Sequence, residues 1–335
     1  MAKPARATSS GSFTDDLEFQ RLISKVAWMY HVSNLSQSEI AEKLVISQAR
    51  VSRLLEQAKL NGTVRTEVVV PRGLYTDLES QLESTYNLKE AHVFDVNHTD
   101  DESELIDDLG QLLALRLINS GISANVIGFT SWSRSLRSTV TALDNLKNGE
   151  ARYVVEMLGD VGDPSAQHEA ALSTQRLAEI VHAQPMFLRV PGVVESKSLR
   201  DSLIKNDPHV HEALRQLDRV ELALVGIGTC EIVPPLTGGD NFFTEKQFAQ
   251  ARKEGAVGQV NLRFIDKNGN AIKSSLDDLV VGITLQQLKQ ADVIIGVAGG
   301  PSKFQAIRAA IRGGWVNTLA TDVDTAKWLL VNSEV

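Results

Sequence analysis

The amino-acid sequence predicts an α/β protein in which an N-terminal winged helix-turn-helix domain precedes a doubly wound α/β domain. Three observations lead to this prediction. Residues 35–62 combine two short amphipathic helical patterns with a tight turn between them. From about residue 91, apolar runs typical of buried strands alternate with helical patterns, as in parallel sheets. The length of 335 residues suggests about two domains, and 43% apolar residues suffice for a sizeable core.

The first helix of the hairpin is expected to start at Ser36, because Glu39 three residues later completes a capping-box pattern. Its apolar face comprises Ile40, Ala41 and Leu44. A second serine, Ser47, opens the next helix, whose apolar face comprises Val51, Leu54 and Leu55. Helices this short need a partner to be stable, and the amphipathic segment 14–31 supplies a third helix.

The outer face of the second helix is suited to DNA. In the helix-turn-helix plan this helix enters the major groove. Serine, glutamine and arginine can bond base edges or phosphates, and alanine can touch a thymine methyl group. The alternative is an ordinary helical hairpin with a solvated polar face. The candidate DNA-binding residues are Ser36, Gln37, Ser47, Gln48, Ala49, Arg50, Ser52 and Arg53.

The turn between the two helices carries an unusual residue. Residues 44–47 read Leu-Val-Ile-Ser, whereas the helix-turn-helix pattern usually has glycine at the position of Val45. That position commonly has a positive φ, which is costly for a β-branched residue. We therefore expect the turn to be slightly reshaped.

The charge of the chain is unevenly distributed. The net charge is −8, from 34 Lys and Arg against 42 Asp and Glu, but residues 1–73 carry 10 basic against 7 acidic residues. A mildly basic head on an acidic body fits DNA contact by one end.

The sequence suggests four segments. Residues 1–12 form a small, polar, disordered tail, residues 13–73 the helix-turn-helix domain, residues 74–90 a linker helix and residues 91–335 the α/β domain. Residues 63–70 are β-rich and are either a wing, with Arg65 near a phosphate, or a plain linking strand. The helix expected over 74–86 turns Leu78 and Leu82 inward and could also pair subunits.

The α/β domain is expected to contain seven strands and six helices, with a hairpin over 264–272 that turns at Asn268-Gly269. The predicted strands are 91–96, 125–129, 153–158, 186–188, 222–225, 293–297 and 316–320. The predicted helices are 102–119, 133–146, 167–182, 243–254, 302–311 and 322–330.

Three loops follow predicted strands, where open parallel sheets bind ligands. Residues 128–135, Gly-Phe-Thr-Ser-Trp-Ser-Arg-Ser, combine a glycine, hydroxyls and a helix start into an anion site suited to phosphate, or else form an ordinary serine-rich cap. Residues 225–230 are a poor dinucleotide fingerprint and a better loop for close backbone approach. Residues 297–303 end in Lys303, which either pairs with an anionic oxygen or is a surface lysine.

Five segments together resemble the SorC-type sugar-responsive transcriptional regulators. They are residues 35–62, GFTSWSRSL at 128–136, VGIG at 225–228, GAVGQVNLRFIDKNGN at 255–270 and VAGGPSKFQAIRAAIRGGWVNTLATDVDTAKWLL at 297–330. The resemblance implies a C-terminal sensor domain similar to ribose-5-phosphate isomerase and glucosamine-6-phosphate deaminase. It also implies a phosphorylated sugar or polyol as effector, operator DNA as partner, and a homo-oligomer, most often a tetramer.

Carried over by position, the resemblance implies an effector site with one departure. Gln259 stands where the family usually has an aspartate that takes sugar hydroxyls; glutamine is neutral and both donates and accepts. The implied effector-binding residues are Gly128, Thr130, Ser131, Trp132, Ser133, Gly228, Gln259 and Lys303.

The rival function is a sugar-phosphate isomerase or deaminase with an added helical domain. Such an enzyme needs a general base poised in its pocket. No spacing singles out any of the candidate bases, which are Glu156, Asp160, His168, Glu169, Glu231 and Asp240. The sequence therefore favours a regulator of a carbohydrate or polyol operon over an enzyme.

The seven histidines are scattered and Cys230 is alone, so neither a metal site, a cofactor nor a disulfide is expected. A lone cysteine fits a reducing cytosol, and we find neither a membrane-spanning run nor a signal peptide. The sequence predicts a cytoplasmic protein.

Overall fold

The computed structural model describes residues 11–65, 73–96, 102–143, 146, 149–232 and 240–334. The chain divides into two compact units, one ending at Val69 and one beginning at Val70. Each unit is described by itself below. Most of the predicted tail and most of the predicted wing lie outside the described residues, but Gly11 and Ser12, assigned above to the tail, belong to the first helix.

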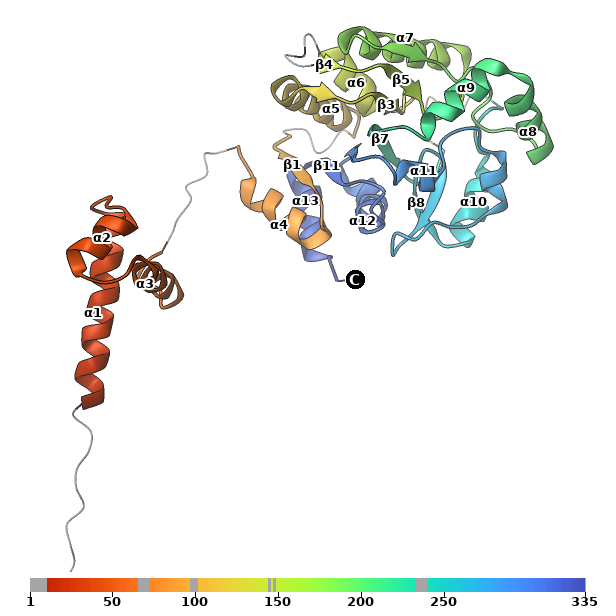
Figure 1. Ribbon diagram of the computed structural model, residues 1–335. Helices are drawn as coiled ribbons and strands as arrows, with labels where there is room; N and C mark the ends of the chain where they lie inside the picture. The colour runs from red at the N-terminus through yellow and green to blue at the C-terminus, as the bar shows by residue number, and fades with distance from the viewer. Residues whose placement is uncertain are drawn as a thin grey trace, which may run out of the picture. The chain divides into compact units, whose positions relative to one another are not determined.

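Three helices form the N-terminal unit, which is coloured red to orange in Figure 1. They are α1 (Gly11–His31), α2 (Gln37–Leu44) and α3 (Gln48–Leu60). The capping box is present, since the Glu39 amide donates to Ser36 Oγ at 3.3 Å and the Ser36 amide donates to Glu39 Oε2 at 2.8 Å. The shared core contains the predicted Ile40, Val51, Leu54 and Leu55, while the predicted Ala41 and Leu44 are partly buried against it. The other buried members of this core are Ile23, Val26, Ala27 and Ala58.

The C-terminal unit is built on a parallel sheet in the order β1-β11-β10-β7-β3-β5-β6. The bounds of these strands in chain order are β1 Glu90–Phe94, β3 Val126–Phe129, β5 Tyr153–Glu156, β6 Gln184–Met186, β7 Leu222–Gly228, β10 Val293–Val297 and β11 Thr318–Asp322. Two short strands, β2 (Ile122–Ser123) and β4 (Gly149–Glu150), pair separately. All seven strands predicted from the sequence are present, with β6 and β11 displaced by about two residues.

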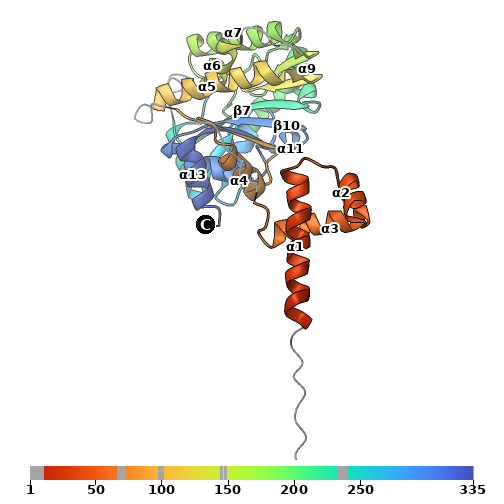
Figure 2. The same cartoon turned by 90° about the vertical axis from the view of Figure 1, so that its left-hand side faces the viewer.

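Helices cover both faces of this sheet, as Figure 2 shows. One face packs against α5 (Glu102–Ser120), α6 (Arg134–Ala142) and α7 (Pro164–Ile180). The other face packs against α4, α9 and α11 to α13, whose bounds are α4 Thr76–Tyr86, α9 Pro208–Leu217, α11 Leu285–Leu288, α12 Phe304–Arg312 and α13 Val323–Val331. Alternate residues of a strand lie in the cores on opposite faces of the sheet. Leu224 lies in the core with α5 and α6, whereas Val225 lies in the core with α12 and α13. The doubly wound prediction is confirmed.

An antiparallel hairpin extends the carboxyl end of β7. Its strands are β8 (Ala256–Val260) and β9 (Arg263–Asp266), and Gly228 of β7 pairs with Gln259 of β8. The two turn residues, Asn261 and Leu262, have φ values of 50° and 59°, the left-handed region that suits a tight hairpin. The predicted turn at Asn268-Gly269 also forms, with the Gly269 amide donating to the Asp266 carbonyl at 2.9 Å.

Among the described residues, the sequence prediction missed helices α8 (Lys197–Asn206), α9 and α11 and the β8–β9 hairpin. Helices α8 and α9 lie between β6 and β7. Helix α10 (Glu245–Lys253), predicted over 243–254, is present and packs beside β8. Asp207 separates α8 from α9: it follows the last residue of α8, and its side chain caps α9, which begins at Pro208. Helix α4, expected as a linker, has Leu82 fully buried and packs on β1 and α13.

Candidate functional site

Helix α3 presents a polar outer face. Ser47, Gln48, Ala49, Arg50, Ser52 and Arg53 are all exposed. Ser47 Oγ accepts the Arg50 amide at 3.3 Å and so is occupied as the helix cap. The Ser36 hydroxyl is likewise held by Glu39, at 2.7 Å, and Gln37 is half-buried. The side chains most free to reach a partner are therefore those of α3.

The turn before α3 keeps the left-handed geometry. Val45 has φ 55° and ψ 46°, caps α2 and is 90% exposed. The Ile46 amide donates to the Ala41 carbonyl at 3.0 Å, which closes the turn. The expectation that valine reshapes this turn is wrong: the chain adopts the usual conformation, with a β-branched residue in the left-handed region.

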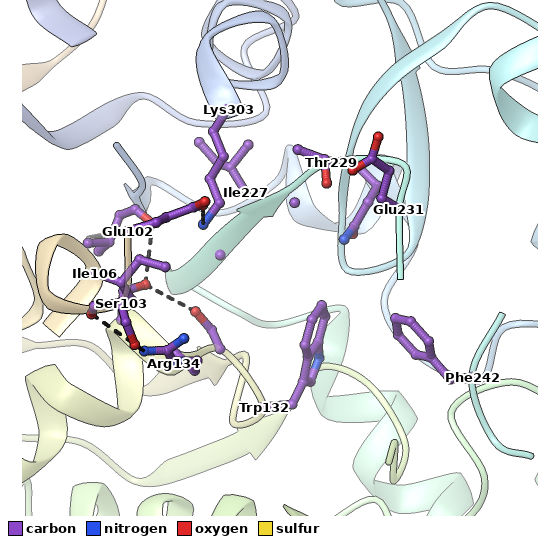
Figure 3. Close-up of a pocket in the computed structure, with 16 residues that line it drawn as sticks. Glu102, Ser103, Ile106, Trp132, Arg134, Ile227, Thr229, Glu231, Phe242 and Lys303 are labelled. Atoms are coloured by element: carbon purple, nitrogen blue, oxygen red, sulfur yellow. Dashed lines mark hydrogen bonds and ion pairs between the residues drawn. The ribbon is translucent and has the colours of Figure 1, made fainter. Parts of the chain in front are cut away.

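A pocket of about 350 Å³ opens at the carboxyl ends of β3, β7 and β10 (Figure 3). This edge is where ligands bind in doubly wound folds. The pocket walls come from the starts of α5, α6 and α12, from the end of β7 and from β8. The lining residues are Glu102, Ser103, Ile106, Trp132, Ser133, Arg134, Ser135, Gly226, Ile227, Gly228, Thr229, Glu231, Phe242, Gln259, Val297 and Lys303.

The start of α6 gives the pocket an anion-binding end. Ser133 has extended backbone as the N-cap of α6, and its side chain does not bond the first-turn amides. Those amides have no partner within the helix and carry the positive end of its dipole. The Ser133 and Ser135 hydroxyls lie 3.2 Å apart. A Cβ on Gly226 would stand 2.8 Å from Ser133 Oγ, so only glycine lets β7 run this close.

Two cations lie beside this helix start. Lys303, from the 3-10 turn Pro301–Lys303 that leads into α12, is largely buried, and burial lowers the pKa of its ammonium. Its Nζ is 3.9 Å from Glu102 Oε1, a long ion pair. Arg134 donates to the hydroxyl of Ser103. Both cations are thus held by the first turn of α5.

The opposite end of the pocket is aromatic and acidic. Trp132 and Phe242 meet edge to face, with ring centroids 6.3 Å apart. Thr229 and Glu231 lie beside them, across the pocket from Lys303 (Figure 3). The Gln259 amide nitrogen lies over Gly228, only 2.0 Å from where a Cβ of that residue would stand.

Five of the eight residues proposed from the sequence for the effector line this pocket: Trp132, Ser133, Gly228, Gln259 and Lys303. Gly128 is instead packed within β3, where a Cβ would stand 2.6 Å from Met157 Sδ. The Thr130 hydroxyl donates to Asn261 Oδ1 at 2.8 Å and ties β3 to the β8–β9 turn. Ser131 is buried and is not among the lining residues.

Sequence reasoning missed the wall that α5 contributes. Glu102, Ser103 and Ile106 line the pocket, yet their segment reads only as the start of an amphipathic helix. Phe242 was also missed, because no motif surrounds it. The one available signal was the start of the predicted helix at Glu102, since a helix start exposes amide groups.

Most of the candidate general bases lie elsewhere. The buried Glu156 carboxylate accepts from the Leu188 amide at 2.9 Å and from the Thr174 hydroxyl at 3.0 Å, and its burial raises its pKa. Asp160 pairs with Arg189 at 2.6 Å. Of the six candidates only Glu231 lines the pocket, and the described residues contain no histidine, cysteine and carboxylate group that could hold a metal ion.

The comparisons with known proteins agree with this geometry. The family described as "Putative sugar-binding domain" matches residues 73–331. The deoxyribonucleoside regulator of Bacillus subtilis is 30% identical over 94% of this chain and 99% of its own length. The sorbitol operon regulator of Klebsiella pneumoniae is 29% identical over 95% of this chain and 99% of its own length.

A solved structure is also similar to this chain over most of its length. The crystal structure of the full-length sorbitol operon regulator SorC from Klebsiella pneumoniae has a TM-score of 0.67 and 27% identity, and it covers 93% of this chain and 98% of the other. These relatives are transcriptional regulators and not enzymes. No described helix is long and apolar enough to cross a membrane. The chain therefore belongs to the sugar-binding transcriptional regulators of the SorC and DeoR type.

Proposed function

We propose that the protein controls a carbohydrate or polyol catabolic operon and that its affinity for operator DNA is set by a phosphorylated sugar or polyol bound in the pocket. The single observation that carries this proposal is the start of α6, where unpaired amides face a pocket that also holds Lys303 and Arg134. A phosphate carries close to two negative charges near neutral pH and needs several donors. This site offers them at little entropic cost, because backbone amides are already fixed.

DNA is read by α3. The exposed residues from Gln48 to Arg53 would lie in the major groove, where Arg50 and Arg53 can grip guanine or a phosphate. Arg50 makes no ion pair with another described residue. One helix-turn-helix unit covers few base pairs, so useful affinity needs at least two copies. We therefore expect a homo-oligomer, most simply a tetramer, and light scattering on the full chain measures it.

Helix α5 offers a route from the pocket toward the DNA-binding unit. Its first turn lines the pocket, and Arg116 near its other end forms an ion pair with Glu90 of β1. The β1 amides of Ala91 and Val93 each donate to a glutamate of α4, at 2.9 Å. A shift of α5 would therefore reach α4, the first helix of the α/β unit.

The test is a titration of operator DNA with and without sugar phosphates. An effector changes DNA affinity only through its different affinities for the two states of the protein. Lys303→Ala should leave operator binding without effector nearly unchanged and abolish the effector's influence. Lys246→Ala, at an exposed position of α10, is the matched control and should respond like the wild type. A full effector response in Lys303→Ala would reject the pocket.

A further inference from the structure

Glu231 is an exposed carboxylate that lines the pocket. Within the part of the chain that the structure describes, no hydrogen bond or ion pair engages it. Its backbone is nonetheless fixed, since the carbonyl of the preceding Cys230 accepts Arg252 Nη1 at 2.6 Å. The side chain stands at the end of the pocket away from Lys303 (Figure 3).

Two other side-chain acceptors of the pocket, Gln259 and Glu102, already hold a hydrogen bond. Gln259 Oε1 accepts the Leu262 amide at 2.8 Å and thereby closes the β8–β9 turn. Only the Gln259 amide nitrogen, a donor, is left for the pocket. Glu102 Oε1 accepts the Ser302 hydroxyl at 2.9 Å and lies at the cationic end, 3.9 Å from Lys303 Nζ. At the far end, Glu231 supplies a carboxylate acceptor beside the hydroxyl of Thr229.

We propose that Glu231 determines effector specificity: it accepts hydrogen bonds from effector hydroxyls at the end of the pocket opposite Lys303, so that the site takes a sugar or polyol with one anionic group and rejects a bisphosphate. This inference rests on the proposed function, which places the single phosphate at the start of α6. A carboxylate offers two oxygens and can accept from two neighbouring hydroxyls at once.

The same carboxylate repels a second anion. Two negative groups at short range repel each other, so a phosphate placed beside the Glu231 carboxylate is disfavoured. The two cations that line the pocket, Arg134 and Lys303, lie at the other end (Figure 3), and Arg252, near Glu231, is already engaged by Glu245 and by the Cys230 carbonyl. Trp132 and Phe242 instead offer apolar surface to the C–H face of a sugar.

The test measures binding of four probes to the full chain by isothermal titration calorimetry. The probes are inorganic phosphate, ribose 5-phosphate, fructose 6-phosphate and fructose 1,6-bisphosphate. Glu231→Gln keeps the shape of the side chain and removes its charge. Glu195→Gln is the matched control, because Glu195 is exposed and outside the pocket.

In the wild type, we expect the better monophosphate to bind at least about 10-fold more tightly than the bisphosphate. Glu231→Gln should weaken binding of that monophosphate by about 10- to 100-fold, as expected for the loss of hydrogen bonds to a charged group. Glu231→Gln should bind the bisphosphate as tightly as the wild type does, or more tightly, so the preference for the monophosphate is lost. Inorganic phosphate, held at the start of α6, should bind both proteins equally, and Glu195→Gln should match the wild type throughout.

The outcomes separate this inference from the function on which it rests. Unchanged monophosphate affinity and unchanged discrimination in Glu231→Gln would overturn the role of Glu231 while leaving the anion site intact. Preference of the wild type for the bisphosphate would overturn it as well. Failure of every probe to bind the wild type would reject both the phosphate site and the inference. Circular dichroism on each variant confirms that a loss of binding is not a loss of fold.

Discussion

Replacing Val45 should stabilise the DNA-binding unit. Val45 holds φ 55° and ψ 46° with a β-branched side chain that is 90% exposed. A left-handed conformation costs an L-residue about 1–2 kcal/mol, and glycine avoids that cost. Glycine in turn loses about 0.5–1 kcal/mol more backbone entropy on folding. Because an exposed valine contributes almost no packing, Val45→Gly should gain about 0.5–1 kcal/mol.

Native-state hydrogen exchange of the full chain measures this gain locally, since each unit has its own opening equilibrium. Amides of buried α3 residues such as Leu54 and Leu55 should exchange roughly 2- to 5-fold more slowly in Val45→Gly, at about 1.4 kcal/mol per tenfold change. Val45→Asn should act in the same direction, because asparagine tolerates the left-handed region.

A control substitution should have the opposite sign. Val32 is also exposed, at 55%, but its φ is not positive. Val32→Gly therefore removes no strain and only adds freedom to the unfolded chain, which lowers stability. Equal or faster exchange of the α3 amides in Val45→Gly than in the wild type would refute the argument that this turn is strained.

Three further predictions concern DNA, effector and thiol. Arg50→Ala or Arg53→Ala should weaken operator binding by about 1–3 kcal/mol if the arginine reads a base, and should lower the salt dependence of binding if it holds a phosphate. Fluorescence anisotropy at several salt concentrations distinguishes these two roles. A folded double variant with wild-type affinity would contradict both. Glu102→Gln should tighten binding of inorganic phosphate severalfold at low salt, because the Glu102 carboxylate competes with the phosphate for Lys303. Calorimetry measures this affinity, and weaker phosphate binding in the variant would contradict the prediction. Burial raises the pKa of Cys230 to about 12, so its thiol stays protonated at pH 8. The thiol should therefore react with a thiol-specific disulfide reagent only after the protein is unfolded in urea. Rapid reaction of the native protein would contradict the burial of this thiol.

The sequence was most informative where the structure depends on neighbours along the chain. The capping box at Ser36 and Glu39, the apolar face of α3 and the strand-to-helix loop ending at Ser133 are all local, and each is present in the structure. The turn at Val45 was located correctly but its conformation was not, because a local φ penalty of this size is smaller than the packing of three helices around Ile40 and Leu54.

Local sequence motifs do not predict which side chains line the pocket. Thr130 and Ser131 share a motif with Ser133, yet Thr130 is turned to Asn261, 131 positions away, and Ser131 is buried outside the lining. A loop motif states that hydroxyls and amides gather at a helix start, but only the packed fold decides which of them face the ligand.

The specificity of the site lies in contacts that no single motif contains. Lys303 and Glu102 are paired across 201 positions of sequence, and the role left to Gln259 depends on which of its two amide atoms the Leu262 amide engages. Because the β8–β9 turn engages the oxygen, the Gln259 side chain offers the pocket its amide nitrogen, a donor. A ligand hydroxyl can accept from that nitrogen, and it also has a proton to donate, for which Glu231 is a lining carboxylate.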